Sequence, residues 1–325
     1  MSTAKREPLI DIQNYTLEFE TETGIKKVIN DLNLTIYQGE SLGLVGEAGA
    51  GKTTTALSIL RLLDKNAKLK SGKILYKGQD MSTFKEKEME NLRGGNIAMI
   101  FQNPLTSLNP TFTVGEQIAM VYRKHKKMKN KQAWEEAGKL VEVVGIPRER
   151  LKDYPHQFSG GMRQRIGIAA SLVCEPELLI ADEPTTALDV TIQAQILELM
   201  KELQTKYDTS LLMITHNLGI ISELCKDVAV MYAGAIIEYG SVKNVFAKPK
   251  HPYTKGLLGA IPTLADTKER LTAIPGTIAD AYNLPEGCSF SPRCEHATEE
   301  CHKNTPKLVE LEEGHYVACW HHEEV

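Results

Sequence analysis

The sequence lacks three features, each of which would assign it to a broad class of proteins. No uncharged apolar run approaches the roughly 18 residues that a membrane-spanning helix needs. The opening MSTAKREPLIDIQ contains no apolar segment of the kind found in secretion signals. Basic residues are not in excess, since 38 Lys and Arg face 42 Asp and Glu, which argues against a protein that coats nucleic acid. We therefore expect a chain that stays in the cytosol.

Cysteine is also scarce, with six in 325 residues, yet four of them gather near the C-terminus at Cys288, Cys294, Cys301 and Cys319. In a reducing cytosol disulfides are improbable, and clustered cysteines there more often bind metal. The spacing fits neither the C-x₂-C pairs of zinc ribbons nor those of bacterial ferredoxins. Four thiolates still suit a tetrahedral site for zinc or an iron–sulfur cluster. The residues alone favour metal and leave free thiols and disulfides open.

The hydrophobic pattern predicts an α/β fold. Residues 9–19 and 26–36 alternate apolar and polar positions, which is typical of antiparallel strands. Six further strands follow, and helical stretches lie between the last four of them, which indicates a parallel sheet. These strands are expected at 41–46, 72–78, 96–101, 177–182, 210–216 and 228–234, with helices at 52–63 and 248–262. Residues 103–157 interrupt the rhythm and are predicted to form an inserted helical subdomain.

The stretch GEAGAGKT, residues 46–53, matches the pattern G-x-x-x-x-G-K-[ST] between a predicted strand and a predicted helix. The glycines let the backbone turn so that successive N–H groups and the helix N-terminus surround phosphates. Lys52 is expected to reach the β- and γ-phosphates of a nucleotide, and the Thr53 hydroxyl to ligate Mg²⁺. The predicted ATP-binding residues are Gly46, Glu47, Ala48, Gly49, Ala50, Gly51, Lys52, Thr53 and Thr54.

Two acids end the buried strand in ELLIADEP. Asp182 is expected to hold Mg²⁺, and Glu183 to polarise an attacking water as a general base. Adjacent acids at a strand end are often only a solvated turn. The phosphate loop upstream favours the catalytic interpretation.

Between these motifs, FSGGMRQR at 158–165 resembles the signature motif of ATP-binding-cassette (ABC) ATPases. Gln102 in IFQNP, Asp189 in TALD and His216 in LMITHN resemble the Q-loop, the D-loop and the switch histidine, in the order of that family. The likeness runs from about residue 8 to residue 260. It implies an ATPase with a P-loop ABC-type nucleotide-binding domain at 1–261, an antiparallel β subdomain, the helical insertion, and a small cysteine-containing tail at 262–325.

The resemblance also implies roles for these residues. Glu183, His216 and Gln102 would be catalytic, and Gln102 would contact Mg²⁺ together with Thr53 and Asp182. The signature residues would contact the γ-phosphate of an ATP bound by a second subunit, because a helix N-terminus favours an anion there. These residues are Ser159, Gly160, Gly161 and Gln164.

The chain departs from the family at two places. Ala48 and Ala50 stand where relatives commonly have serines, and the backbone donors survive that change. Many ABC proteins place an adenine-stacking aromatic residue just before the position of Gly24, where this chain has Thr23. We take Phe19 as the candidate for that contact, with a place in the core as the alternative.

Two further segments, 103–118 and 250–262, resemble the ATPase subunits of oligopeptide/dipeptide (peptide/nickel) importers. The likeness implies a second homologous ATPase, two membrane permeases, an extracytoplasmic peptide-binding protein, and a peripheral place on the cytoplasmic face of the membrane. Some of those ATPases hold a [4Fe–4S] cluster in the tail, so we expect one at Cys288, Cys294, Cys301 and Cys319, with zinc as its rival.

Two alternatives remain at this point. The cargo could be nickel or another small solute of the same importer family. A protein of a different class, a soluble ABC protein acting on ribosomes or nucleic acid, has only the basic run at 122–132 in its favour, and such a run is usually a solvated face.

Overall fold

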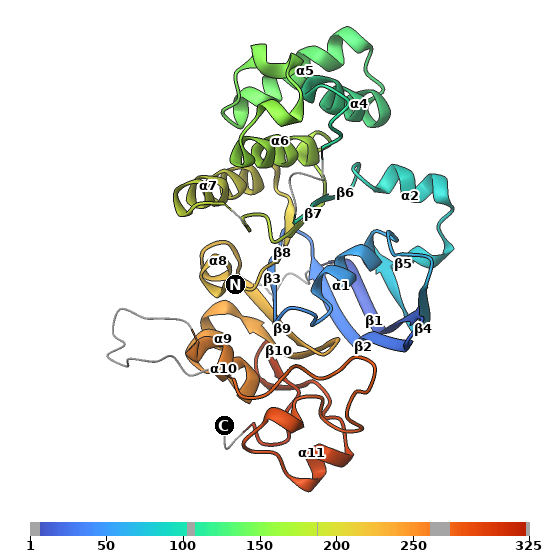
Figure 1. Ribbon diagram of the computed structural model, residues 1–325, viewed down its shortest axis with the longest axis vertical. Helices are drawn as coiled ribbons and strands as arrows, with labels where there is room; N and C mark the ends of the chain where they lie inside the picture. Colours follow the sequence, from blue (N-terminus) through green and yellow to red (C-terminus); the bar gives the residue numbers. More distant parts are fainter. Residues whose placement is uncertain (1–6, 103–107, 187, 261–273, 323–325) are drawn as a thin grey trace. The chain divides into compact units, whose positions relative to one another are not determined.

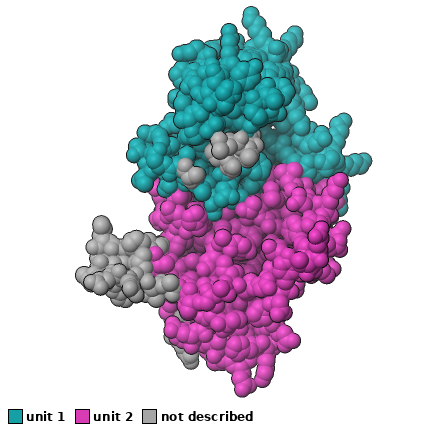
Figure 2. All heavy atoms as spheres, viewed as in Figure 1, with its two compact units in different colours: residues 1–6, 37–40, 83–213 teal, residues 7–36, 41–82, 214–325 magenta. Residues whose placement is uncertain are grey.

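The computed structural model describes residues 7–102, 108–186, 188–260 and 274–322. The chain divides into two compact units, coloured separately in Figure 2. Unit 1 comprises residues 1–6, 37–40 and 83–213, and unit 2 comprises residues 7–36, 41–82 and 214–325. Each unit is described by itself below. Within the described part of the chain, no helix combines the length and the apolar character needed to cross a membrane.

Unit 2 begins with an antiparallel sheet in the order β2-β1-β4-β5, drawn in blue and cyan in Figure 1. Strand β1 alternates buried and less buried positions, as expected of a sheet with one face on the core. It pairs with β4 from Ile10 opposite Tyr76 to Phe19 opposite Ala67. The strands are β1 (Pro8–Thr21), β2 (Gly24–Tyr37), β4 (Ala67–Tyr76) and β5 (Gln79–Asp80).

Unit 2 also contains five strands of a second sheet, in the order β11-β12-β10-β9-β3. Every residue of β3 is buried, and β3 runs parallel to β9. Strand β10 is antiparallel to both β9 and β12. The strands are β3 (Ser41–Val45), β9 (Asp227–Tyr232), β10 (Ala235–Ser241), β11 (Val309–Glu312) and β12 (His315–Val317), and the helices are α1 (Lys52–Ile59), α8 (Leu218–Leu224), α9 (Val242–Ala247), α10 (Pro252–Gly259) and α11 (Glu299–Lys303).

Unit 1 contains three strands in the order β8-β7-β6. Strands β7 and β8 are buried at every position, which explains their unbroken apolar sequences. Helices α4 and α5 pack together, with α6 beside them (Figure 1). The strands are β6 (Ile97–Ile100), β7 (Leu178–Asp182) and β8 (Ser210–Ile214), and the helices are α2 (Glu86–Leu92), α4 (Val114–Lys126), α5 (Asn130–Val143), α6 (Gly160–Leu172) and α7 (Val190–Tyr207).

These sheets and helices confirm the predicted α/β class, with its antiparallel sheet and its helical insertion. Sequence reasoning missed β10 and the two strands of the tail. Strand β12 pairs with β10, with Val317 opposite Glu238, so the tail extends a sheet of unit 2. The predicted domain boundary at 261/262 lies outside the described residues, and the first five residues of the predicted helical subdomain do as well.

A buried pair joins the tail to the strand that it extends. His315 and Glu238 are 1% and 0% exposed, and His315 Nε2 lies 2.8 Å from Glu238 Oε1. The same carboxylate accepts hydrogen bonds from the backbone N–H groups of Lys250 (2.7 Å) and His251 (3.0 Å). A buried carboxylate needs such partners, because it has lost its contacts with water. The pair therefore anchors the tail.

Replacing His315 by alanine removes the side-chain partner of this buried carboxylate. We expect the free energy of unfolding to fall by roughly 2 kcal/mol, measured by urea and thermal unfolding. His302 is an exposed histidine of the same tail, and His302→Ala should change stability by less than about 0.5 kcal/mol. Equal stability of the two variants would contradict the anchoring role.

Candidate nucleotide-binding site

The phosphate loop, residues 46–51, lies between β3 and α1 and packs tightly on neighbouring backbone. Gly46, Gly49 and Gly51 have φ values of 157°, 84° and 105°. A Cβ on Gly46 would stand 2.2 Å from the Met231 carbonyl oxygen, and one on Gly51 would stand 2.9 Å from that of Val28. No side chain fits at these two positions. The packing of unit 2 therefore requires glycine at these two positions of the sequence motif.

Hydrogen bonds hold the loop from both sides. The Lys52 side chain is buried, and its Nζ donates to the carbonyl oxygens of Gly46 (2.7 Å) and Glu47 (3.0 Å). The Gly234 N–H donates to the Ala50 carbonyl at 3.0 Å. Ala48, Gly49 and Thr53 are exposed, and Thr54 is half-buried. The part of this segment that faces solvent is therefore the loop at Ala48 and Gly49, together with Thr53 at the start of α1.

His216 is an exposed residue that follows β8 and belongs to unit 2. Its neighbour Thr215 donates its N–H to the Leu44 carbonyl at 3.4 Å. This bond places the start of the His216 segment at the same end of β3 as the phosphate loop. Phe19 is half-buried and lies in β1, opposite Ala67.

Unit 1 brings together the Q-loop glutamine and the proposed base. Strands β6 and β7 are parallel and paired from Ile97 opposite Leu178 to Ile100 opposite Ala181. Two residues beyond this register, Gln102 Nε2 donates to Glu183 Oε2 at 2.9 Å. Asp182 is buried at the end of β7.

Glu183 itself has a fixed orientation. Its φ of 45° is in the left-handed region, where a residue other than glycine is uncommon. The Thr186 hydroxyl also donates to its Oε2, at 3.0 Å. Two donors on Oε2 therefore hold the carboxylate in one orientation.

The signature residues form the start of α6. Ser159 is its N-cap, and the Ser159 hydroxyl accepts from the Met162 N–H at 3.4 Å. A Cβ on Gly161 would stand 2.5 Å from Ile192 Cγ2 of α7, so α6 and α7 approach closely here. Gly160 is half-buried, and Gln164 is 2% exposed and faces the interior. Asp189 caps α7 in the same way, since it accepts from the Ile192 N–H at 2.9 Å.

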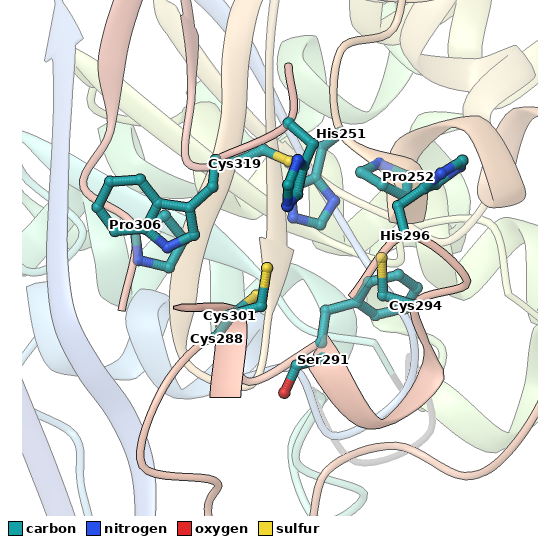
Figure 3. Close-up of a pocket in the computed structure, with 12 residues that line it drawn as sticks. His251, Pro252, Cys288, Ser291, Cys294, His296, Cys301, Pro306 and Cys319 are labelled. Carbon is teal, nitrogen blue, oxygen red and sulfur yellow. The ribbon is translucent and has the colours of Figure 1, made fainter. Parts of the chain in front are cut away.

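The four tail cysteines line one small cavity (Figure 3). Its volume is about 20 Å³, which is room for roughly one water molecule. Burial raises the pKa of the Cys288 thiol to about 11, and it also raises the pKa of Cys294 and Cys319. Burial thus favours the protonated thiols, whereas metals bind the thiolate form.

This geometry corrects the expectation of a metal-bound tail. Within the described ranges, no three side chains of His, Cys, Asp or Glu form a group that could hold a metal ion. The predicted [4Fe–4S] cluster at Cys288, Cys294, Cys301 and Cys319 is therefore wrong, and zinc, its rival, has no such group either. All four are free cysteines. Spacing along the chain indicated a cluster of thiols but could not give the arrangement of their sulfur atoms.

Sequence reasoning missed three residues, one from α10 and two from the tail, that reach the nucleotide-binding half of unit 2. Arg293 is bonded to Glu47 of the phosphate loop. The Tyr253 hydroxyl accepts the N–H of the same Glu47 at 2.8 Å. Tyr282 lies at the turn between β1 and β2, where its hydroxyl accepts from Thr23 at 3.2 Å. No sequence motif connects residues so far apart in the chain.

The close packing of the loop generates a test. Gly46→Ala places a Cβ against the Met231 carbonyl, whereas Gly49→Ala meets nothing within 4 Å although its φ is also positive. We expect Gly46→Ala to bind a fluorescent ATP analogue at least about tenfold more weakly than Gly49→Ala, because only the first adds a clash to the backbone strain. Equal affinities in a titration would show that the loop does not depend on this contact.

Comparison with known families agrees with this geometry. The family model described as "ABC transporter" matches residues 29–186. The model described as "Oligopeptide/dipeptide transporter, C-terminal region" matches residues 237–301. The first range contains the phosphate loop, the signature residues and the two acids. The second contains Arg293 and three of the four tail cysteines.

Similar proteins cover nearly the whole chain. The dipeptide transport ATP-binding protein DppD of Bacillus subtilis (strain 168) is 49% identical over 317 residues, which are 97% of this chain and 95% of that protein. The oligopeptide transport ATP-binding protein OppD of Haemophilus influenzae is 45% identical over 315 residues, 96% of this chain and 97% of that protein.

Solved structures share the fold. The dimeric ATP-binding cassette MJ0796, in a post-hydrolysis state with ADP and Pi, has a TM-score of 0.64 at 22% identity and covers 72% of this chain and 98% of its own. CbiO1 of Clostridium perfringens has a TM-score of 0.63 at 25% identity and covers 74% of this chain and 92% of its own. With these likenesses and the two matching models, the chain belongs to the ABC transporter family, among the ATP-binding proteins that carry the oligopeptide/dipeptide transporter C-terminal region.

Proposed function

We propose that this protein is the ATP-hydrolysing subunit of an ABC importer for dipeptides or oligopeptides. The observation that carries the proposal is the near full-length likeness to relatives named as dipeptide and oligopeptide transport ATP-binding proteins. The two family models support it, because they occur in this chain in sequence, first the cassette and then the C-terminal region.

The substrate of an ABC ATPase is ATP with Mg²⁺, and the residues of this chain suit that ion. The Thr53 hydroxyl, the Gln102 side-chain amide and the Asp182 carboxylate offer the hard oxygen donors that Mg²⁺ prefers. Gln102 uses its amide nitrogen on Glu183, so its oxygen is the atom left for the metal. When bound, the ion neutralises charge on the phosphates.

Glu183 is the general base of the proposed reaction. The hydrogen bonds from Gln102 and Thr186 orient its carboxylate, and a fixed carboxylate accepts a proton from water more effectively than a mobile one. His216 orients the water and the γ-phosphate, and Lys52 leaves the loop carbonyls for the phosphates. Phe19 contacts the adenine.

The signature residues serve an ATP bound by another cassette. Ser159 and the N-terminus of α6 offer a hydroxyl and backbone N–H groups to the γ-phosphate, and the helix dipole favours the negative charge. Gly160 and Gly161 allow this approach, and Asp189 acts at the same interface. The proposed partners are a second homologous ATPase, two membrane permeases and an external peptide-binding protein, with this subunit on the cytoplasmic face of the membrane.

Transport itself supplies the decisive experiment. The chain is reconstituted with its candidate permeases and partner ATPase in vesicles, and uptake of labelled dipeptides and longer peptides is measured with and without ATP. ATP-dependent uptake that requires the peptide-binding protein supports the proposal. Uptake of nickel instead of peptide would mean that the same transporter carries a different cargo.

The chemistry of Glu183 can be tested in the same system. Glu183→Gln keeps the size of the side chain and loses the base, so ATP binding should persist while turnover falls about 100-fold or more. Glu198→Gln changes an exposed acid on α7 and serves as the control with wild-type turnover. Turnover of Glu183→Gln within twofold of wild type would mean that another group activates the water.

If each ATP site is completed by residues of a second subunit, the rate of ATP hydrolysis should depend on assembly of the subunits. The isolated chain should bind ATP but hydrolyse it slowly, because Ser159 and Gly161 must come from a different subunit. Steady-state rates should rise with the partner subunits present. Full activity of a monomer, independent of protein concentration, would contradict the shared-site interpretation.

A further inference from the structure

The second residue of the phosphate loop is an acid, and an arginine of the tail is bonded to it through both carboxylate oxygens. Arg293 Nη1 donates to Glu47 Oε2 at 2.7 Å, and Nη2 donates to Oε1 at 3.2 Å. The Arg293 side chain is 4% exposed and that of Glu47 is 27% exposed. Because it has two parallel charge-assisted bonds and a buried donor, this pair is stronger than an ordinary ion pair in solvent.

Arg293 is held in place independently of Glu47. Its Nε donates to the Pro275 carbonyl at 2.8 Å, and its guanidinium lies beside the rings of Phe290 and Tyr232. The bond to Glu47 raises the pKa of Arg293 above its ordinary value, so the group stays charged. The tail thus presents one fixed positive charge to the phosphate loop.

Glu47 is held at three points. Arg293 binds its carboxylate, and the Tyr253 hydroxyl accepts its N–H at 2.8 Å. Its carbonyl accepts from Lys52 Nζ at 3.0 Å. The residue that Arg293 holds is therefore also bonded to the lysine expected to bind the phosphates.

The negative charge of Glu47 would weaken ATP binding if Arg293 did not neutralise it. A carboxylate within a loop that receives a triphosphate repels it, and this repulsion is strong where protein displaces water. Paired with Arg293, the carboxylate adds no net charge, and the loop keeps its backbone donors and Lys52 for the phosphates.

We propose that Arg293 is a positioning residue of the ATP site, which acts through Glu47 by neutralising and holding this side chain so that the loop accepts a triphosphate. The inference rests on the ATP-binding function proposed above. It adds that the tail is part of the nucleotide site, although the tail contains none of the family's ATP motifs.

The experiment measures ATP and adenosine binding by displacement of a fluorescent ATP analogue from the full-length protein. Arg293→Met keeps the length of the side chain and leaves Glu47 uncompensated, so affinity for ATP should fall about tenfold or more. Affinity for adenosine, which has no phosphates, should stay within twofold of wild type. The double variant Glu47→Gln/Arg293→Met should recover ATP affinity to within about threefold of wild type.

A matched control and a second variant complete the design. Lys303→Met breaks another tail ion pair, the exposed one with Glu299, and should not change ATP affinity. If Arg293→Met does not fold, the single variant Glu47→Gln tests the proposed role of Arg293 instead. It leaves the Arg293 charge uncompensated, so ATP should bind more tightly than to wild type, with an affinity that falls more steeply as salt rises.

Several outcomes overturn the inference. One is an unchanged ATP affinity in Arg293→Met. Another is equal loss of ATP and adenosine binding without recovery in the double variant, which a purely structural role would produce. A third is wild-type affinity and salt dependence in Glu47→Gln. If wild-type protein itself fails to bind ATP, the proposed function fails and not merely the role of Arg293.

Discussion

The constraint on which the rest of unit 2 depends is the close approach of the phosphate loop to neighbouring backbone. Gly46 lies against the Met231 carbonyl of β9, and Gly51 lies against the Val28 carbonyl of β2. The loop therefore packs on both sheets of the unit at once. Any side chain at either glycine would push the loop away from one of them, so the glycines that favour phosphate binding also join the two sheets.

The tail is attached to this core by contacts of several kinds. Strand β12 extends the sheet at β10, and the buried pair His315 and Glu238 fixes that edge. Arg293 of the tail bonds to the loop residue Glu47, which is also bonded to Tyr253 of α10. A short chain segment with little apolar surface gains a defined structure from such polar anchors when each buried group is satisfied. Such contacts account for the ordered structure of the described part of the tail.

Unit 1 obtains its catalytic geometry from strand register. The parallel pairing of β6 and β7 brings Gln102 next to Glu183, two residues beyond the last paired residue of each strand. Caps at Ser159 and Asp189 then fix the first turns of α6 and α7. A one-residue slip of register would turn these side chains to opposite faces, so the buried apolar strands determine where the chemistry can occur.

The sequence by itself determined the α/β class, the phosphate loop, the acids at the end of β7 and the family, because these depend on local patterns and on short motifs with fixed spacing. It could not show that Arg293 holds Glu47, since a separation of 246 residues leaves no periodic signal. It also indicated a metal cluster that the structure contradicts. Ligation depends on the directions of four thiols, and burial by distant segments decides whether they are thiolates. Only the tertiary structure fixes both.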